Sequence, residues 1–461
     1  MIPKLTSASL ATLACVFALA GAFATAPAGA AVPTELSFVE AWDRLLQVSD
    51  ELRAAEAEVR GQQQLAQAAR KLRQPEIALD LRRLDYQKSL DVPLGPLGPL
   101  VAPIGIADPF EVQLDGWRTR PVVTASMPLY SGGQIPAARN AADAAVRGAQ
   151  AGRHAAEESQ AMLLARAYFG QQLAARAREV RADVRAGLER HLQRAEALER
   201  EGLISRAQRL QAQVARDEAE REYVRARNQL ETAEILLATL LRSEPPVSLA
   251  TPLFVLPRVA EHALGTPPAD AHPRLRELYA LADQSEAGIR VEEARFKPTV
   301  FAFGQYDLYR DDALFTEPDW IYGIGLRFTV LSNQGRRERL RAAREQAAQV
   351  QSGISETRVQ LSILAARATR ELDTTRAEFE LLESALALAQ ENLRLQTIAF
   401  REGQATSLDV VDAELGLGRA RVQRAQAAHD YVLALAQWLE ASGQVNSLAG
   451  LVTHPERIVV E

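Results

Sequence analysis

Residues 128–136 read PLYSGGQIP, and residues 330–336 read VLSNQGR. In each segment a strand-like apolar stretch ends at glycine, and a pattern of helical period follows. Glycine suits such a junction because it permits backbone conformations that other residues resist. The two segments lie 202 residues apart and mark an internal repeat. They predict two strand-to-helix junctions, with Gly132, Gly133 and Gly335 at the turns.

The segments after these glycines predict two very long helices, at about residues 134–200 and 336–401. Neither contains a proline after Pro136. At about 1.5 Å of rise per residue, each helix would extend roughly 100 Å. Apolar residues recur every three or four positions, as in a coiled coil. No compact globular core needs helices of this length, so we expect a long antiparallel bundle.

The repeat covers most of the chain. Pro75 and Pro298 lie 223 residues apart, more than the 202 that separate the junctions. The first half therefore has about 21 extra residues between Pro75 and Leu129. That interval contains DVPLGPLGP at residues 91–99, where proline and glycine disfavour regular structure. We expect a longer loop in the first half.

Each half is expected to contain a helix, a strand, a loop, a second strand, a very long helix, a break and a last helix. The strand predictions depend on alternation, as in Ile77, Leu79 and Leu81, and on nearby aromatic residues typical of a membrane interface. The expected boundaries are a signal peptide at 1–30; a first repeat at 31–242, with a helix at about 38–74, strands at about 76–86 and 121–130, and helices at about 134–200 and 205–242; a proline-rich linker at 243–271; a second repeat at 272–442, with strands at about 298–309 and 320–331 and helices at about 336–401 and 406–442; and a tail at 443–461.

The N-terminus has the pattern of a cleaved export signal. Lys4 precedes an apolar run over residues 5–23, and Ala-Gly-Ala at 28–30 suits a signal peptidase. Cys15 is the only cysteine and lies in this leader, so the mature chain should contain neither disulfides nor thiolate metal sites. No later stretch reaches about 18 consecutive apolar residues, so any membrane insertion is expected through strands.

Catalysis, cofactors and nucleic acid are not indicated. The six histidines are scattered without metal-ligand spacing, and no glycine-rich phosphate loop follows a strand. The net charge of −6 offers no general attraction for nucleic acid. We therefore expect a protein that is not an enzyme and has no metal site.

The repeat, the PLYSGG junction and the glycine-containing helix breaks resemble the TolC-like outer-membrane efflux proteins over about residues 36–442. The resemblance implies a mainly α fold with a small β part, built by duplication. It implies a homotrimer in which four strands per chain form a 12-stranded β-barrel above a coiled-coil α-helical tunnel. It also implies an outer-membrane location in contact with lipid, a long periplasmic extension, a periplasmic adaptor, and an inner-membrane pump or ABC exporter. The alternative is a periplasmic coiled-coil adaptor or spacer. The cargo stays open among drugs, metal ions and secreted proteins.

The resemblance also assigns two candidate sites. The helix breaks would form the periplasmic tips and contact the adaptor through Gly202, Leu203, Ile204, Ser205, Gly403 and Thr406. Leu203 and Ile204 are expected to be exposed there. Asp409 and Asp412 lie three residues apart on one helical face, as two gate aspartates do in the family, and would form charge rings in a trimer.

The gate departs from the family pattern. Phe400 and Gln208 occupy the places of residues that hold a closed gate by hydrogen bonding in some members, and Ala405 stands where an arginine is found. Phe400 cannot donate a hydrogen bond. The closed state is therefore expected to depend on a different lock, either apolar packing or Arg206 and Arg401.

Overall fold

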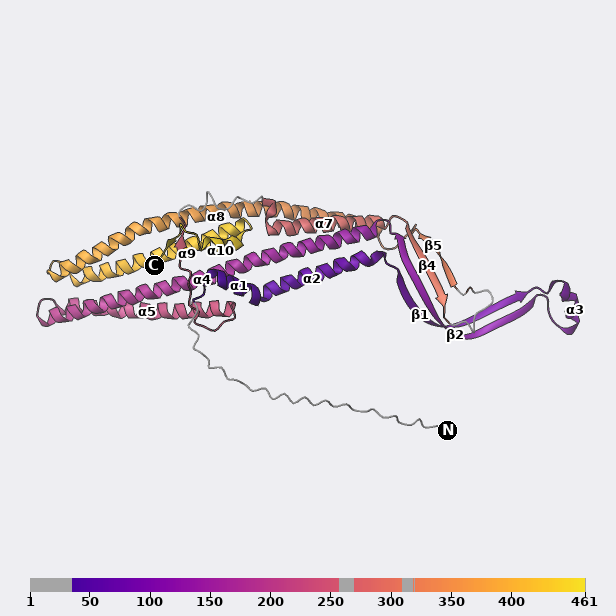
Figure 1. Cartoon of the computed structure of the whole chain (residues 1–461), viewed down its shortest axis with the longest axis horizontal. Helices are drawn as coiled ribbons and strands as arrows, with labels where there is room; N and C mark the ends of the chain where they lie inside the picture. Colours follow the sequence, from indigo (N-terminus) through magenta and orange to yellow (C-terminus); the bar gives the residue numbers. More distant parts are fainter. Residues whose placement is uncertain (1–34, 257–268, 309–317, 319, 461) are drawn as a thin grey trace, which may run out of the picture.

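A computed structural model describes residues 35–256, 269–308, 318 and 320–460. The expected signal peptide lies outside these residues, as does part of the expected linker. Figure 1 shows long helices running side by side, with a strand region at one end of them. The fold class predicted from the sequence, mainly α with a small β part and an internal duplication, is confirmed.

Two continuous helices run the length of the helical part (Figure 1). They are α4 (Gln134–Arg200, 67 residues) and α8 (Arg336–Arg401, 66 residues). Shorter helices pack along each in pairs: α2 (Asp50–Arg70) and α5 (Arg206–Leu240) on α4, and α7 (Pro273–Ala294) and α9 (Ser407–Ala441) on α8. Helix α4 also contacts α7 and α9, which joins the two repeats.

The helix expected at 38–74 is interrupted. It consists of α1 (Phe38–Val48), α2 and a 3₁₀ turn at Lys71–Arg73. Ser49 separates the two helices with an extended backbone (φ −67°, ψ 124°), and its side chain accepts a hydrogen bond from the Leu52 amide. A serine that caps a new helix in this way ends the preceding one. The sequence did not indicate this break, because apolar residues recur with helical periodicity on both sides of Ser49.

The strands form one antiparallel sheet in the order β1-β2-β4-β5. They span β1 (Glu76–Val92), β2 (Phe110–Tyr130), β4 (Thr299–Asp307) and β5 (Trp320–Arg327). The expectation for the first pair, at 76–86 and 121–130, was too short. The extra residues of the first repeat mainly lengthen this hairpin, because cross-strand pairing continues without interruption from Glu76↔Ser126 to Val92↔Phe110. Only residues 93–109 form the loop, which contains short 3₁₀ turns and α3 (Gly98–Val101).

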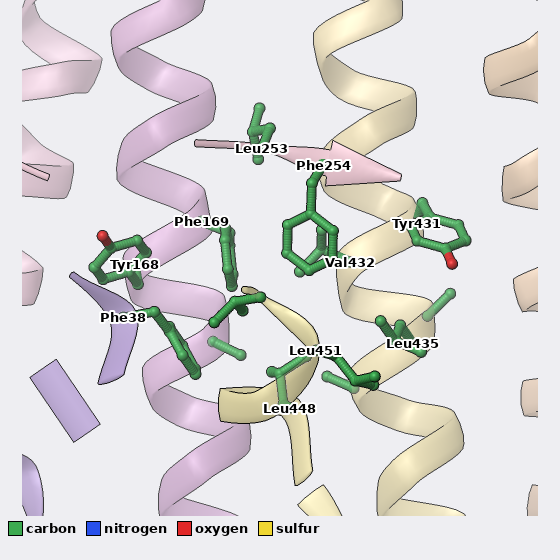
Figure 2. Packing of buried hydrophobic residues seen from close by; sticks show 14 of the residues in the cluster. Phe38, Tyr168, Phe169, Leu253, Phe254, Tyr431, Val432, Leu435, Leu448 and Leu451 are labelled. Atoms are coloured by element: carbon green, nitrogen blue, oxygen red, sulfur yellow. The ribbon is translucent and has the colours of Figure 1, made fainter. Parts of the chain in front are cut away.

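The largest apolar core lies midway along the helices and joins both repeats. Figure 2 shows Phe38 of α1, Tyr168 and Phe169 of α4, and Tyr431 of α9 around Phe254. Phe254 belongs to β3 (Phe254–Val255), which pairs with β6 (Ile458–Val459). The two segments that sequence analysis expected to be a linker and a tail therefore contribute to one core. The short elements Val445–Ser447 and α10 (Leu448–Leu451) pack there too.

The Tyr168 hydroxyl fixes this core to the chain that enters it. It donates to the Leu36 carbonyl oxygen at 2.7 Å and accepts from the Thr251 amide at 2.9 Å. Thr251 in turn accepts from the Phe38 amide at 3.0 Å. Buried polar groups are costly unless they are paired, so these bonds specify one arrangement of the segments.

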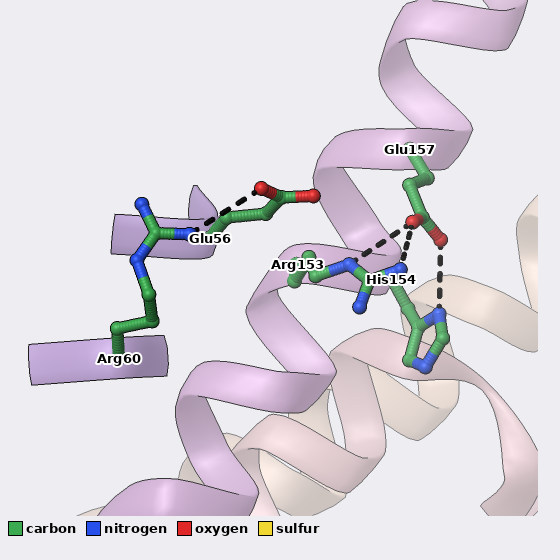
Figure 3. Close-up of polar contacts among 5 residues, drawn as sticks. All are labelled: Glu56, Arg60, Arg153, His154 and Glu157. Atoms are coloured by element: carbon green, nitrogen blue, oxygen red, sulfur yellow. Dashed lines mark hydrogen bonds and ion pairs between the residues drawn. The ribbon is translucent and has the colours of Figure 1, made fainter. Parts of the chain in front are cut away.

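Between this core and the sheet, α2 and α4 each have polar contacts between residues on neighbouring turns of the same helix. Figure 3 shows Arg153 and His154 converging on Glu157 of the same helix, with contacts of 2.7 Å and 3.0 Å. On α2, Arg60 pairs with Glu56 at 3.5 Å. Pairs of this kind contribute about 0.3–0.5 kcal/mol each, so they support the helices without determining the fold.

Candidate gate and helix tips

The two helix tips have the same backbone construction. Gly202 follows α4 and Gly403 follows α8, each with φ of 74°. Leu203 N donates to the Leu198 carbonyl oxygen at 2.9 Å, and Gln404 N to that of Ala399 at 2.8 Å. These are the bonds of a Schellman motif, which needs a left-handed residue after the helix and so favours glycine.

Each tip then starts its next helix with a capping box. At the first tip Ser205 and Gln208 exchange hydrogen bonds, and at the second Thr406 and Asp409 do so. The side chain at the third helical position bonds back to the cap residue in both. The tips are therefore short and well-defined reversals, and they differ in charge because one uses Gln208 where the other uses Asp409.

The tips expose fewer apolar side chains than expected. Leu203 is 68% exposed. Ile204, expected to be exposed beside it, is half-buried and packs against Leu192, Ala195 and Ala212. The exposure expected for Ile204 is therefore wrong. Its side chain packs between α4 and α5 at the first tip, and Leu203 is the apolar residue that this tip exposes.

Asp409 and Asp412 lie on the exposed side of α9, while Val410, Val411 and Ala413 between and beside them are buried. The Asp409 carboxylate accepts from the Thr406 amide and hydroxyl, both at 2.7 Å. These hydrogen bonds lower the pKa of Asp409 below its ordinary value. Asp409 thus combines an exposed negative charge with a structural role that the sequence analysis had not assigned.

Phe400 is placed away from this exposed face. It is 6% exposed and packs on the ring of His191, with centroids 5.0 Å apart. The Nε2 atom of His191 lies 2.8 Å from the Ser407 hydroxyl oxygen, and both of these residues are buried. This cluster joins α4, α8 and α9 just above the second tip. Phe400 therefore lies in the interior, and its contacts include His191 and Ser407, which the sequence did not reveal.

The pKa of His191 is lowered in this cluster. Burial lowers its pKa, and the nearby positive charge of Arg194 lowers it further, against a smaller opposite effect of the Ser407 hydrogen bond. Its Nδ1 atom is buried and has no hydrogen-bond partner among the described residues. The isolated histidine in the sequence gave no sign of this contact because its partners lie more than 200 residues away.

Helices α4 and α9 approach closely above the cluster. A Cβ atom at Gly418 would overlap the Val184 side chain, and one at Gly187 would overlap the Glu414 carboxylate. Burial raises the pKa of Glu414. The absence of side chains at both glycines lets the two helices pack tightly.

The junction glycines have different requirements. Gly132 (φ 68°) lies against the Ala294 carbonyl oxygen, which would be 2.9 Å from an added Cβ atom. Gly133 (φ 99°) precedes α4 and has open space around it, while Gly335 (φ 59°) precedes α8. Nearby, Arg139 donates to the carbonyl oxygens at the end of α2, and Arg336 does the same at the end of α7. In both repeats an arginine of the long helix thus binds the end of the preceding short helix, while the glycine turns differ.

Glu158 on α4 is a buried carboxyl group that the sequence analysis did not single out. Burial raises its pKa to about 7, and the negative charge of Glu440 on α9 adds to the effect, whereas Arg274 on α7 opposes it. Arg274 lies 3.7 Å from Glu440. Three helices from both repeats thus converge on a group that titrates near neutral pH.

Replacing this group should change the pH dependence of stability. Between the ordinary pKa of 4.5 and about 7, folded Glu158 keeps a proton that the unfolded chain has released, so stability falls as the pH rises through this interval. Glu158→Gln should therefore stabilise the protein at pH 8 by about 2 kcal/mol and have little effect at pH 4.5. Thermal unfolding in detergent at both pH values would measure this. Glu56→Gln, at an exposed site, is the control, and an equal shift of Glu158→Gln at both pH values would contradict the assignment.

Among the described residues, no helix is both long and apolar enough to cross a membrane. The described part of the chain also contains no group of three or more histidine, cysteine, aspartate or glutamate residues arranged to hold a metal ion.

The family model described as outer membrane efflux protein matches residues 41–241 and 269–444. Among solved structures, CusC aligns with a TM-score of 0.73 at 15% identity, over 89% of this chain and 93% of that chain. VceC of Vibrio cholerae aligns at 0.70 and 18%, over 88% and 96%. The MtrE outer membrane channel of Neisseria gonorrhoeae, solved in its open state, aligns at 0.69 and 18%, over 88% and 89%. These structures share the fold. A direct comparison with curated sequences finds no significant match.

Proposed function

The chain belongs to the outer membrane efflux protein family, and from that premise we propose that three copies assemble into one conduit that a periplasmic adaptor connects to an inner-membrane pump. As a member of the family, the protein is an efflux channel of the outer membrane whose helices extend into the periplasm. The family match over both repeats favours this function over that of a periplasmic adaptor or spacer. The family is one of transport proteins, and the proposal includes no catalytic step.

The evidence for assembly is the four-stranded sheet. Directly opposed residues of antiparallel strands share a face, and one face of this sheet is apolar across all four strands. By register it carries Ile77, Leu79, Leu81, Val123, Ala125, Val300, Ala302, Tyr322, Ile324 and Leu326. Most of the large side chains among them are exposed, Ile77 by 72% and Ile324 by 72%. A surface of this kind suits lipid.

The opposite face is polar near the end of β4. It carries the partly buried ion pair of Arg120 and Asp307, at 2.6 Å, together with Asp80, Thr124 and Gln305. Strands β1 and β5 are the edges of the sheet. In lipid, unpaired backbone groups on these edges would be costly, and pairing β5 of one copy with β1 of the next removes the edges. Three copies, as the family resemblance implies, would give twelve strands.

The proposed gate is the second tip. Asp409 and Asp412, exposed on α9, would form two rings of three carboxylates around the axis and attract cations. The buried cluster of Phe400, His191 and Ser407 would hold α9 against α4 in the closed state. Leu203 and the backbone around Gly202, Ser205, Gly403 and Thr406 would contact the adaptor, because exposed apolar residues at a projecting tip suit a docking partner. Ile204 would support this contact from beneath.

Fractionation with a matched pair of variants tests the assembly. The protein should appear in the outer membrane as a species that resists SDS and has three times the monomer mass until it is boiled. Ile324→Arg, on the apolar face, should strongly reduce this species, because a charge facing lipid near the middle of the bilayer costs about 2–4 kcal/mol per copy. Gln305→Arg, on the polar face, should leave it intact. Recovery of the wild-type protein as a periplasmic monomer would overturn the proposal.

A further inference from the structure

The β1–β2 hairpin continues well beyond the rest of the sheet. Strand β4 ends opposite Val122, whereas β1 and β2 stay paired as far as Val92↔Phe110. Figure 1 shows this hairpin passing the ends of β4 and β5 and changing direction before α3. Within it, Gly116 has φ of 141°, a conformation that favours glycine and allows a strong local bend. We define the extension as residues 83–119, including the loop at 93–109.

The two faces of the hairpin exchange polarity where the extension begins. Up to Leu81 and Pro121, most of the large apolar residues lie on the face proposed to contact lipid, with Val122 as an exception on the opposite face. In the extension that same face becomes polar. By register it carries Arg83, Asp85, Gln87, Ser89, Asp91, Glu111, Gln113, Asp115 and Thr119, with Trp117 as its aromatic member. Because pairing is continuous, this reversal is a property of the sequence and does not arise from a register shift.

The opposite face becomes apolar at the same point. Below the extension it contains Asp80, Arg82 and Arg120. Within the extension it contains Leu84, Tyr86, Leu90, Val92, Val112 and Phe110, and by register Lys88 and Arg118 are its two basic positions. Val92 is 45% exposed and Phe110 43%. The face of the hairpin that is polar within the proposed barrel is therefore apolar in the extension. This face is directed toward the axis of the barrel and not toward lipid.

The loop at the tip continues this apolar surface. Leu97, Leu100 and Ile104 are 59%, 72% and 73% exposed. The loop is nevertheless closed, because Asp108 accepts a hydrogen bond from the Leu94 amide at 2.9 Å and its side chain fills the space over Gly98. A structured loop with this many exposed apolar residues marks a contact surface.

We propose that the extensions of the assembled copies pack against one another through this inner apolar face and the tip loop, and so constrict the outer mouth of the channel. The proposal rests on the proposed trimeric barrel. Copies related by the axis of a barrel have inner faces directed toward that axis, so the apolar surfaces of the extensions face one another. These surfaces would also continue the contacts between copies that the pairing of β5 with β1 makes. Lipid is an unsuitable occupant because the lipid-side face of the extension is charged. Trp117, with the Arg83 guanidinium over its ring at 5.4 Å, marks the level at which that face leaves the membrane.

Cysteine cross-linking in the assembled protein tests this contact. All variants carry Cys15→Ser, so that each contains one cysteine. Phe110→Cys lies on the inner face and Gln113→Cys on the outer face, three residues away. With a short bismaleimide on intact cells, Phe110→Cys should yield at least about tenfold more covalent dimer than Gln113→Cys, because cysteines held together react at a high effective concentration.

The outcomes separate this inference from the proposed function. If the SDS-resistant trimer forms and the two cysteines cross-link equally or not at all, the extensions do not meet and the inference is wrong. If no trimer forms in either variant or in the parent, the proposed assembly itself fails. As a second measurement, Leu97→Ser with Leu100→Ser and Ile104→Ser should raise the single-channel conductance. An unchanged conductance in a normally assembled trimer would overturn the constriction.

Discussion

Replacing both exposed aspartates of α9, Asp409→Gln with Asp412→Asn, should lower the preference of the open channel for K⁺ over Cl⁻ by about tenfold. Three unit charges about 5 Å from a monovalent ion contribute about 2.5 kcal/mol in water before salt screening. A loss of about 1.4 kcal/mol is already a tenfold change. Reversal potentials of single channels in a salt gradient would measure the effect.

The chain itself provides the controls for this experiment. Gln208 fills the capping position at the first tip, so Asp409→Gln should remove the charge and keep the capping box. Asp409→Glu should keep both the cap and the selectivity. If the double variant retains the wild-type ion preference, the aspartates do not line the conducting path, and Asp409 serves only to cap α9.

Phe169→Ala should destabilise the protein by about 3–5 kcal/mol, as expected when a fully buried aromatic ring is removed. Phe169 is 0% exposed and lies within 5.3 Å of the rings of Phe38 and Tyr168 and 6.0 Å of that of Phe254, measured between centroids. The resulting cavity would loosen α1 and β3 together. We expect a lower midpoint of thermal unfolding and faster proteolysis between the two repeats.

Leu203→Ala is the control for this stability measurement. Leu203 is a large apolar residue on the exposed first tip, so its truncation should change the unfolding midpoint little. If Phe169→Ala changed the unfolding midpoint as little as Leu203→Ala, the core midway along the helices would not be what stabilises the contact between the two repeats.

Local signals in the sequence were sufficient for the long helices and the tips. The two long helices contain no proline after Pro136, and glycine recurs at 202 and 403 where each of them ends. Both signals can be read from neighbouring residues alone. The Schellman motifs and capping boxes satisfy backbone groups within a few residues, so their sequence patterns are direct. The predicted length of the first hairpin was too short, because its alternation changes face after Leu81 and the proline and glycine residues at 91–99 indicated a loop.

The candidate gate was only partly visible. The sequence and the family resemblance selected Asp409, Asp412 and Phe400, and the contact that holds the gate closed stays a prediction. They did not reveal His191 and Ser407, because a buried contact between residues more than 200 positions apart leaves no periodic signal. They also gave Ile204 an exposure that the contact with Leu192 removes.

By itself, the sequence determined the duplicated order of elements, the length of the helical column and the positions of its turns, since these follow from backbone preferences and short-range periodicity. Only the tertiary structure decided which distant segments share a core and which buried polar groups meet there. It also decided which face of the long hairpin is apolar at each level. Those features depend on the register of strands and on the approach of helices far apart in the chain, where packing and desolvation prevail over local propensity.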